Sequence, residues 1–149
     1  MKRKFFAAFL SLCMVIGLVP MTALAVEETA TPILATDTAL KSGNYVLSSD
    51  VTLSSGALTI AKDETVTIDL AGHTLTNKPG KHTIIISLGG SLTITDTVGT
   101  GRVDNVSHGR AAVENSGTVN ILGGEYTRSQ ENGQSSSDNG GNSYYVLLN

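Results

Sequence analysis

The stretch TVTIDLAGHTLTN, Thr65 to Asn77, alternates apolar and polar residues, stops doing so at Ala71-Gly72-His73, and then resumes. Successive side chains of a β-strand point to opposite faces, so the apolar residues on both sides of the interruption are expected to face one core. Glycine tolerates positive φ and is favoured where the chain turns sharply. The pattern therefore predicts two short strands joined by a corner, with His73 exposed on that corner.

Similar segments recur along the chain at a regular distance. The clearest set is Val66-Thr67-Ile68, Leu92-Thr93-Ile94 and Val119-Asn120-Ile121. Two further pairs keep nearly the same spacing, namely Ile86 with Val113 and Leu75 with Val103. The period is about 26 to 27 residues, which is typical of solenoids, propellers and other arrays.

The content of each repeat selects among these architectures. From Tyr45 onward the chain consists of short segments rich in Thr, Val and Ile, which are separated by Gly, Asn, Asp or Ser and show no helical periodicity. A propeller blade needs about 40 residues and a leucine-rich repeat needs a ladder of Leu and Asn, so neither fits. Three short strands and three turns in each repeat predict an all-β fold, the parallel β-helix solenoid.

The N-terminal segment has the features of a secretory signal peptide. Basic residues at positions 2–4 precede an apolar run at 5–19, and Ala23-Leu24-Ala25 matches a cleavage site. An uncleaved membrane anchor is the alternative, but the run has about 15 residues and a spanning helix needs about 20. We expect removal of residues 1–25, secretion of the remainder, and no membrane insertion after cleavage.

Removal of this segment would leave an acidic chain without cysteine. The full chain has 10 Lys and Arg against 13 Asp and Glu, and three of the basic residues lie in the signal segment, which leaves 7 − 13 = −6. A chain this acidic, with no basic cluster in its sequence, is not expected to bind nucleic acid or anionic membrane surfaces. The only cysteine, Cys13, also lies in that segment, so disulfides and thiolate zinc sites are excluded from the remainder.

The remainder is expected to form one domain at residues 37–149. Residues 26–36 are small and polar and are expected to be a flexible lead-in. Asp37 to Gly43 can form a short helix, with a capping residue at its start and a glycine at its end, and this helix would cap the first coil. The polar, low-complexity stretch 129–143 is expected to be a loop expelled from a corner.

The end of the chain returns to the repeat. The segment at 145–149 aligns with that at 111–115, and the loop explains why they are further apart than the other copies. The last coil then has no cap, which indicates the N-terminal part of a longer protein and also permits end-to-end self-association. Four asparagines each end a strand and are expected to form hydrogen bonds from coil to coil, namely Asn77, Asn105, Asn115 and Asn149.

Part of the chain resembles the right-handed parallel β-helix, or pectin-lyase-like, repeats of secreted or cell-surface proteins of Gram-positive bacteria. The stretches that carry the resemblance are YVLSSDVTLSSGALTIAKDETVTIDLAGHTLTN at 45–77, GSLTITDTVGTGRVDN at 90–105 and SGTVNILGGEYT at 116–127. The resemblance implies an extracellular or cell-wall location and an adhesive or carbohydrate-contacting role. The fold also occurs in polysaccharide lyases and hydrolases, so it does not decide the activity.

No group of residues matches a catalytic site of these enzymes. A lyase needs acidic residues that converge on calcium beside a basic residue, and a hydrolase needs clustered aspartates. The available residues form no such doublet: Asp96, Asp104, Glu114, Glu125, Arg102, Arg110 and His108. The histidines at 73, 82 and 108 lack the spacing of zinc motifs. We therefore expect no catalytic residue, no metal site and no cofactor within this chain.

Tyrosines are the candidate carbohydrate-binding residues. Proteins bind sugars by stacking aromatic rings on their apolar faces. Beyond residue 25 the chain has no Trp or Phe, and Tyr144 and Tyr145 lie beside the polar loop, where a contact surface is expected. Tyr126 is the third candidate. The alternative for Tyr144 and Tyr145 is that one packs inward and the other decorates the strand.

Two classes of function follow from these observations. The first is a secreted or cell-surface β-helix module with a structural, adhesive or glycan-contacting role, whose partners are glycans or surface proteins. The second is the N-terminal part of a secreted polysaccharide lyase or glycoside hydrolase whose catalytic coils lie downstream.

Overall fold

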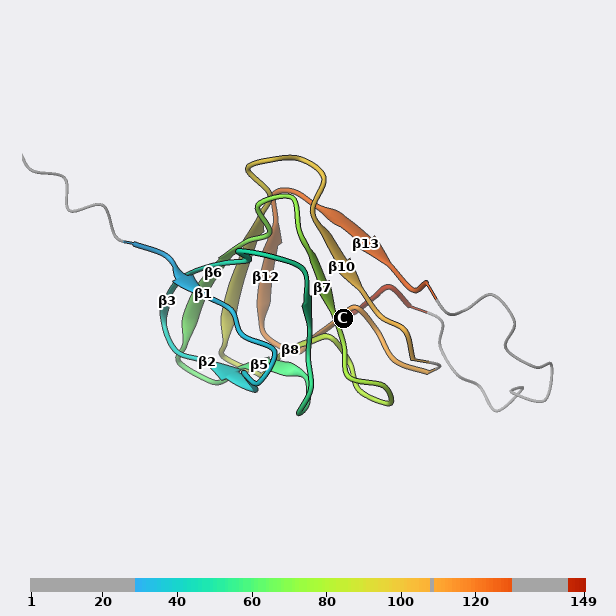
Figure 1. The fold of residues 1–149 in the computed structure, drawn as a ribbon. Helices are drawn as coiled ribbons and strands as arrows, with labels where there is room; N and C mark the ends of the chain where they lie inside the picture. The colour runs from blue at the N-terminus through green and yellow to red at the C-terminus, as the bar shows by residue number, and fades with distance from the viewer. Residues whose placement is uncertain (1–28, 108, 130–144) are drawn as a thin grey trace, which may run out of the picture.

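A computed structural model describes residues 29–107, 109–129 and 145–149, which form strands joined by corners, with no helix among these residues (Figure 1). All the pairings between the strands are parallel. Each set of three successive strands from β3 onward contributes one strand to each of three sheets, and the next set stacks on it. The predicted all-β parallel solenoid is therefore confirmed.

The three sheets have the following strands. The first sheet has the order β1 (Thr31–Pro32), β3 (Gly43–Val46), β6 (Thr65–Asp69), β9 (Ser91–Thr95) and β12 (Thr118–Ile121). The second has the order β13 (Glu125–Thr127), β10 (Arg102–Asp104), β7 (Thr74–Thr76) and β4 (Val51–Thr52). The third has the order β14 (Leu147–Leu148), β11 (Val113–Asn115), β8 (Ile84–Ile86), β5 (Leu58–Ile60) and β2 (Ala39–Leu40).

The register of the first sheet matches the sequence repeat. Thr93 pairs with Thr67 on one side and with Asn120 on the other, as the alignment of the three segments predicts. In the third sheet the partner of Val113 is Ile84, so the predicted alignment of Val113 with Ile86 is wrong. A shift of two residues keeps every side chain on its face, so the alternation of the sequence does not distinguish the two registers.

The inward residues of successive coils stack into a continuous apolar column. Val66 and Ile68 lie beside Leu92 and Ile94 of the next coil, and all four are almost completely buried. The positions in the last coil are more open, and Ile121 is 39% exposed. Burial of this apolar surface is the main force that holds the coils together.

The predicted helix at 37–43 is wrong. Strand β2 lies within this segment and pairs with β5, which buries Leu40 at 3% exposure. Asp37 instead closes a turn, since its amide donates to the Leu34 carbonyl at 3.0 Å and its carboxylate accepts from the Leu34 amide at 2.9 Å. Capping signals contribute little compared with strand pairing and burial in a solenoid.

The first coil also begins before residue 37. Strand β1 pairs with β3, and Ile33 is buried in the core at 3% exposure. The prediction of a flexible lead-in is therefore wrong for residues 31–36, which belong to the solenoid. The signal segment 1–25 lies outside the described residues.

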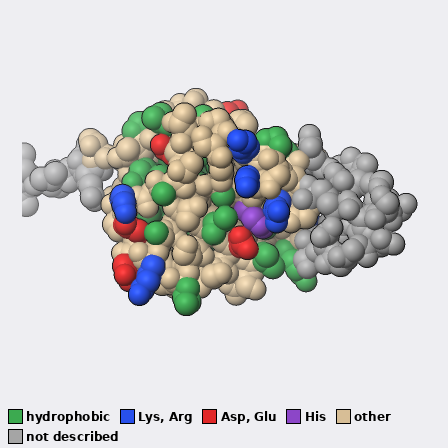
Figure 2. All heavy atoms as spheres, turned by 90° about the horizontal axis from the view of Figure 1, so that it is seen from below, with side chains coloured by type: hydrophobic (Ala, Val, Ile, Leu, Met, Phe, Trp, Pro, Cys, Tyr) green, Lys and Arg blue, Asp and Glu red, His purple; other side chains and the backbone are tan. Residues whose placement is uncertain are grey.

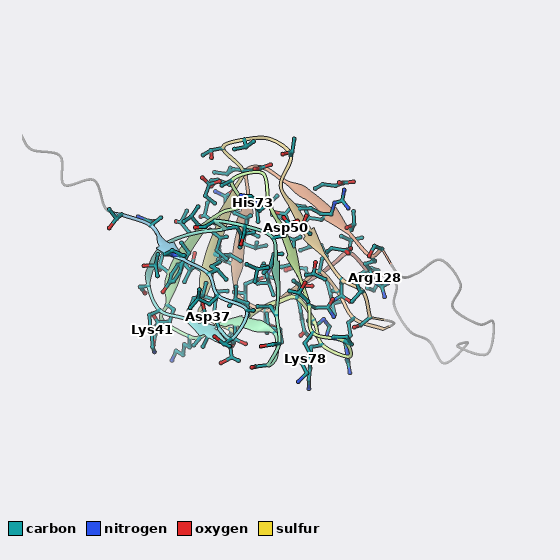
Figure 3. All side chains as sticks on the ribbon, viewed as in Figure 1. Asp37, Lys41, Asp50, His73, Lys78 and Arg128 are labelled. Carbon is teal, nitrogen blue, oxygen red and sulfur yellow. The ribbon has the colours of Figure 1, made fainter. Side chains whose placement is uncertain are left out.

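The corner at Ala71-Gly72 is confirmed. Both residues have positive φ, 48° and 81°, and the His73 amide donates to the Leu70 carbonyl at 2.9 Å. The side chain of His73 is 39% exposed, and its Nδ1 lies 3.5 Å from Asp50 Oδ1 (Figure 3). His73 is therefore an accessible corner residue, as predicted.

A shorter corner, between β11 and β12, leaves no room for a side chain. A Cβ atom on Gly117 would overlap the Gly90 carbonyl oxygen and lie 2.6 Å from the Ser87 carbonyl oxygen. We expect Gly117→Ala to lower the free energy of unfolding by about 1–3 kcal/mol, measured by urea denaturation. Gly56→Ala is the control, because the nearest atom lies 3.9 Å away, and equal midpoints for the two variants would contradict the tight stacking of this corner.

Candidate functional site

The segments that connect the second sheet to the third stack on one another at one side of the solenoid. One of these segments is 53–57, between β4 and β5, and we call the described residues of the other three, 77–83, 105–107 with 109–112, and 128–129 with 145–146, the long corner. Residue 108 and residues 130–144 lie outside the described part of the chain. Nearly all of the predicted polar loop 129–143 falls within this second undescribed range. Because coils of a solenoid stack in register, side chains that are far apart in sequence become neighbours here.

Buried asparagines hold the backbone of the long corner. Asn77, which is completely buried, accepts from the Val106 amide at 2.7 Å, and its Nδ2 lies 2.7 Å from Ser107 Oγ. Asn105 Oδ1 accepts from the Ser107 amide at 2.8 Å, and its Nδ2 donates to the Lys81 carbonyl at 3.0 Å in the preceding coil. The predicted coil-to-coil asparagine bonds are confirmed. They fix the positions of the residues between them.

Asn115 and Asn149 continue this pattern. Asn115 Nδ2 donates to Asn149 Oδ1 at 2.5 Å, between β11 of the third sheet and the last residue of the chain. Strand β14 pairs with β11 through Val113 and Leu147, so the predicted alignment of 145–149 with 111–115 is confirmed. Leu147 and Leu148 thus belong to the third sheet of the solenoid.

The outer surface of the long corner is basic. The long corner contains Lys78, Lys81, Arg110 and Arg128, which are four of the seven Lys and Arg residues in the described part of the chain, but the Nε and Nη1 atoms of Arg128 are buried. Figure 2 shows Lys and Arg side chains gathered beside a histidine and an acidic side chain on one face. In Figure 3, Lys78 and Arg128 lie on the side of the solenoid away from Lys41. The sequence has no basic run, so this grouping arises from the stacking of separate segments.

The basic residues do not stand out in the sequence because most of them lie in different segments of the chain. Lys81, Arg110 and Arg128 lie in three different segments of the long corner. The signal that would have found them is the repeat itself, since the interval from Lys81 to Arg110 equals that from Ile84 to Val113, which are register partners in the adjoining strands. Placing the basic residues on this register would have aligned them at one corner.

His82 lies within the basic cluster and is largely enclosed. Its side chain is 13% exposed, its Nδ1 accepts from the Ala111 amide at 3.0 Å, and its Nε2 lies 3.5 Å from Glu114 Oε2. Burial lowers the pKa of His82, the Glu114 carboxylate opposes this shift, and the positive charges of Arg110 and Arg128 add to it. The imidazole is therefore neutral at pH 7, with the proton on Nε2.

The depressed pKa of His82 predicts a loss of stability in mild acid. The unfolded chain takes up a proton near pH 6.5, whereas the folded chain resists it, so the free energy of unfolding falls as the pH drops below about 6.5. We expect His82→Gln to lose less stability than the original chain between pH 7.5 and pH 5.5, as measured by urea midpoints. Equal losses in both chains would show that His82 does not couple protonation to folding.

The two candidate tyrosines in the described part of the chain, Tyr126 and Tyr145, have different surroundings. Tyr126 lies on β13, packs partly against the core, and donates from its hydroxyl to the Gly123 carbonyl at 3.1 Å. Burial and, to a smaller extent, the charge of Asp96 raise its pKa to about 12. Tyr145 is 51% exposed and lines an open hollow of about 400 Å³ with Leu147, Leu148 and Asn149. Tyr144 lies outside the described residues.

Two of the candidate catalytic carboxylates stabilise corners. Asp96 accepts from the Gly72 amide at 2.8 Å and from the Gly101 amide at 2.6 Å, which ties two successive corners together. Asp104 accepts from Ser129 Oγ at 2.5 Å and from Thr127 Oγ1 at 2.7 Å. Burial raises the pKa of each carboxyl, but hydrogen bonds outweigh it and hold both pKa values below 3.8. Both groups are thus ionised acceptors at neutral pH.

The remaining candidate catalytic residues do not form one group in the described part of the chain. Arg102 Nε donates to Glu125 Oε2 at 3.0 Å on the exposed surface of the second sheet, whereas Glu114 lies beside His82 in the third. His108 lies outside the described residues. Within the described ranges, no three His, Cys, Asp or Glu side chains are placed to hold a metal ion.

Comparisons with known proteins do not assign this chain to a family. No protein-family model, curated protein or solved structure matched the chain. In the described part of the chain, no helix has the length and apolar character needed to cross a bilayer. The parallel solenoid and the basic long corner are therefore the features on which a functional proposal can rest.

Proposed function

We propose that this chain is a non-catalytic β-solenoid module of a secreted or cell-surface bacterial protein, and that its outer surface contacts glycans. The N-terminal segment, with its basic start, apolar run and Ala-Leu-Ala site, supports export. The resemblance to surface-protein repeats of Gram-positive bacteria supports a cell-wall location.

One observation carries the non-catalytic part of the proposal. The two candidate catalytic aspartates, Asp96 and Asp104, serve as hydrogen-bond acceptors at the corners, and other aspartates do the same. Asp69, for example, accepts from the Ala71 amide at 2.9 Å and from Thr97 Oγ1 at 2.8 Å in the next coil. A carboxylate that holds two corners in this way is not positioned to exchange protons with a substrate.

Export and glycan contact are tested separately. Expression with its own N-terminus in a Gram-positive host is expected to release or display a product that begins at Val26, identified by N-terminal sequencing. The purified product is expected to bind members of a glycan array without changing their length. Retention of residues 1–25 would contradict export. Cleavage of a bound polysaccharide would instead favour the alternative, the N-terminal part of a lyase or hydrolase.

A further inference from the structure

The outer face of the first sheet carries two rows of short polar side chains. Strands β6 and β12 lie on the same side of the solenoid, with β9 between them (Figure 1). Because side chains alternate along a strand, every second residue of these strands points away from the core. The register places the outward residues of successive coils side by side, in one row of Thr65, Ser91 and Thr118 and a second row of Thr67, Thr93 and Asn120.

The polar groups of both rows are accessible. Thr65, Thr118 and Asn120 are exposed, and the other three residues are half-buried. Within the described part of the chain, none of these six side chains takes part in a hydrogen bond. Their hydroxyl and amide groups can each donate and accept hydrogen bonds. These groups are therefore left to bond with water or with a ligand.

This face is almost uncharged. Among the outward residues of β6, β9 and β12 only Asp69 is charged, and its carboxylate already accepts from Thr97 Oγ1 at 2.8 Å. The other two sheets carry more charge on their outer faces, with Arg102 and Glu125 on the second and Glu114 on the third. A charged ligand would lose its hydration on the first sheet without gaining a counter-charge. The face therefore complements a neutral, polar ligand.

The stacking of the coils sets the shape of such a ligand. Neighbouring strands of a sheet lie about 4.8 Å apart, so each row repeats its polar groups at that interval along the solenoid. An extended β-linked glucan presents hydroxyl groups on every sugar ring, at a similar interval, and can lie along both rows. A flexible or helical glycan would first have to be straightened, which costs conformational freedom.

We infer that the outer face of β6, β9 and β12 binds an extended, neutral polysaccharide through these two rows. This inference rests on the proposed glycan-contacting function and adds the charge and shape of the ligand and the place where it binds. Threonine is also favoured in strands because its side chain is β-branched. A test must therefore separate the hydroxyl groups from the shape that suits a strand.

Three soluble polymers test the charge and shape of the ligand. The purified chain is titrated with hydroxyethyl cellulose, which is neutral and extended, with carboxymethyl cellulose, which adds charge to the same backbone, and with dextran, which is neutral and flexible. We expect hydroxyethyl cellulose to bind most tightly, with an affinity that added salt does not change. Tighter binding of carboxymethyl cellulose or of dextran would contradict the inference.

Matched variants test the place where the ligand binds. T67V/T93V keeps the shape of both side chains and loses their hydroxyl groups, so we expect it to bind hydroxyethyl cellulose about tenfold more weakly. T67S/T93S keeps the hydroxyl groups and is expected to bind within about twofold of the original chain. The control T52V/T76V removes two register-paired threonines from the second sheet and is also expected to bind within about twofold. Valine is favoured in strands, so both valine variants are expected to fold.

The variants also distinguish this inference from the proposed function. Unchanged binding by T67V/T93V, or an equal loss in T52V/T76V, would overturn the inference. If T67V/T93V still bound the same members of a glycan array as the original chain, the glycan-contacting function would stand and its site would lie elsewhere. If the original chain bound no glycan of the array and none of the three polymers, the proposed glycan contact itself would be wrong.

Discussion

Replacement of Ile94 by alanine is expected to lower the free energy of unfolding by about 2–5 kcal/mol. Ile94 has no exposed surface and lies in the column between Ile68 and Ile121 of the adjacent coils. Truncation would remove contacts with both coils and leave a cavity that the paired strands cannot close. Urea denaturation monitored by circular dichroism would measure the loss.

The matched control is Ile121→Ala, at the equivalent position one coil later. Ile121 is 39% exposed, so the same truncation removes less buried surface and leaves a partly open site. We expect its effect to be less than half that of Ile94→Ala. Similar losses at the two positions would contradict the gradient of burial along the column.

Asn105→Asp is expected to be the most disruptive change in the long corner, with a loss of about 3 kcal/mol or more. Asn105 is 1% exposed, and its Nδ2 lies 3.0 Å from the Lys81 carbonyl and 2.9 Å from the Ala111 carbonyl. A carboxylate keeps the shape but replaces these donors with a negative charge that faces two carbonyl oxygens. Both carbonyls would lose this hydrogen bond inside the protein.

The control for this substitution is Asn120→Asp, on the exposed outer face of β12. It introduces the same charge where water can solvate it, so we expect a change within about 0.5 kcal/mol. Thermal and urea unfolding of both variants at pH 7 would compare them. A mild effect of Asn105→Asp would show that the asparagine bonds do not hold the long corner.

The parts of the fold that follow from the repeat were predictable from sequence. Alternation in Val66-Thr67-Ile68 and its two copies identifies the inward residues. The equal spacing of the copies aligns the strands of the first sheet, because parallel coils of equal length place equivalent residues side by side. Gly72 also marks its corner, since the backbone there has positive φ.

Other features of the fold depend on contacts between distant residues, which the pattern of residues along the sequence does not show. Local signals at Asp37 and Gly43 favour a helix, but pairing of β2 with β5 replaces it. Ile84 and Ile86 have the same face and character, so only the full length of the intervening corner decides which one pairs with Val113. The basic surface forms because corners with different sequences stack, so no single stretch shows it.

The candidate site was predictable only in part. Tyr145 is exposed, whereas Tyr126 packs partly against the core, which its position in the sequence did not predict. Arg110 was considered for catalysis beside acidic residues, but its bond to the Gly80 carbonyl places it with the lysines of the preceding coil.

Disulfide formation between paired cysteines tests the stacked coils most directly, because every functional argument depends on that stacking. In a Cys13→Ser background, Thr67→Cys/Thr93→Cys and Thr93→Cys/Asn120→Cys place cysteines on register partners about 4.8 Å apart, within the range for a disulfide. Thr67→Cys/Asn120→Cys places them about two coil spacings apart, which is too far. We predict that mild oxidation cross-links the first two pairs and not the third. Failure of both register pairs, or equally fast cross-linking of the third, would contradict the solenoid.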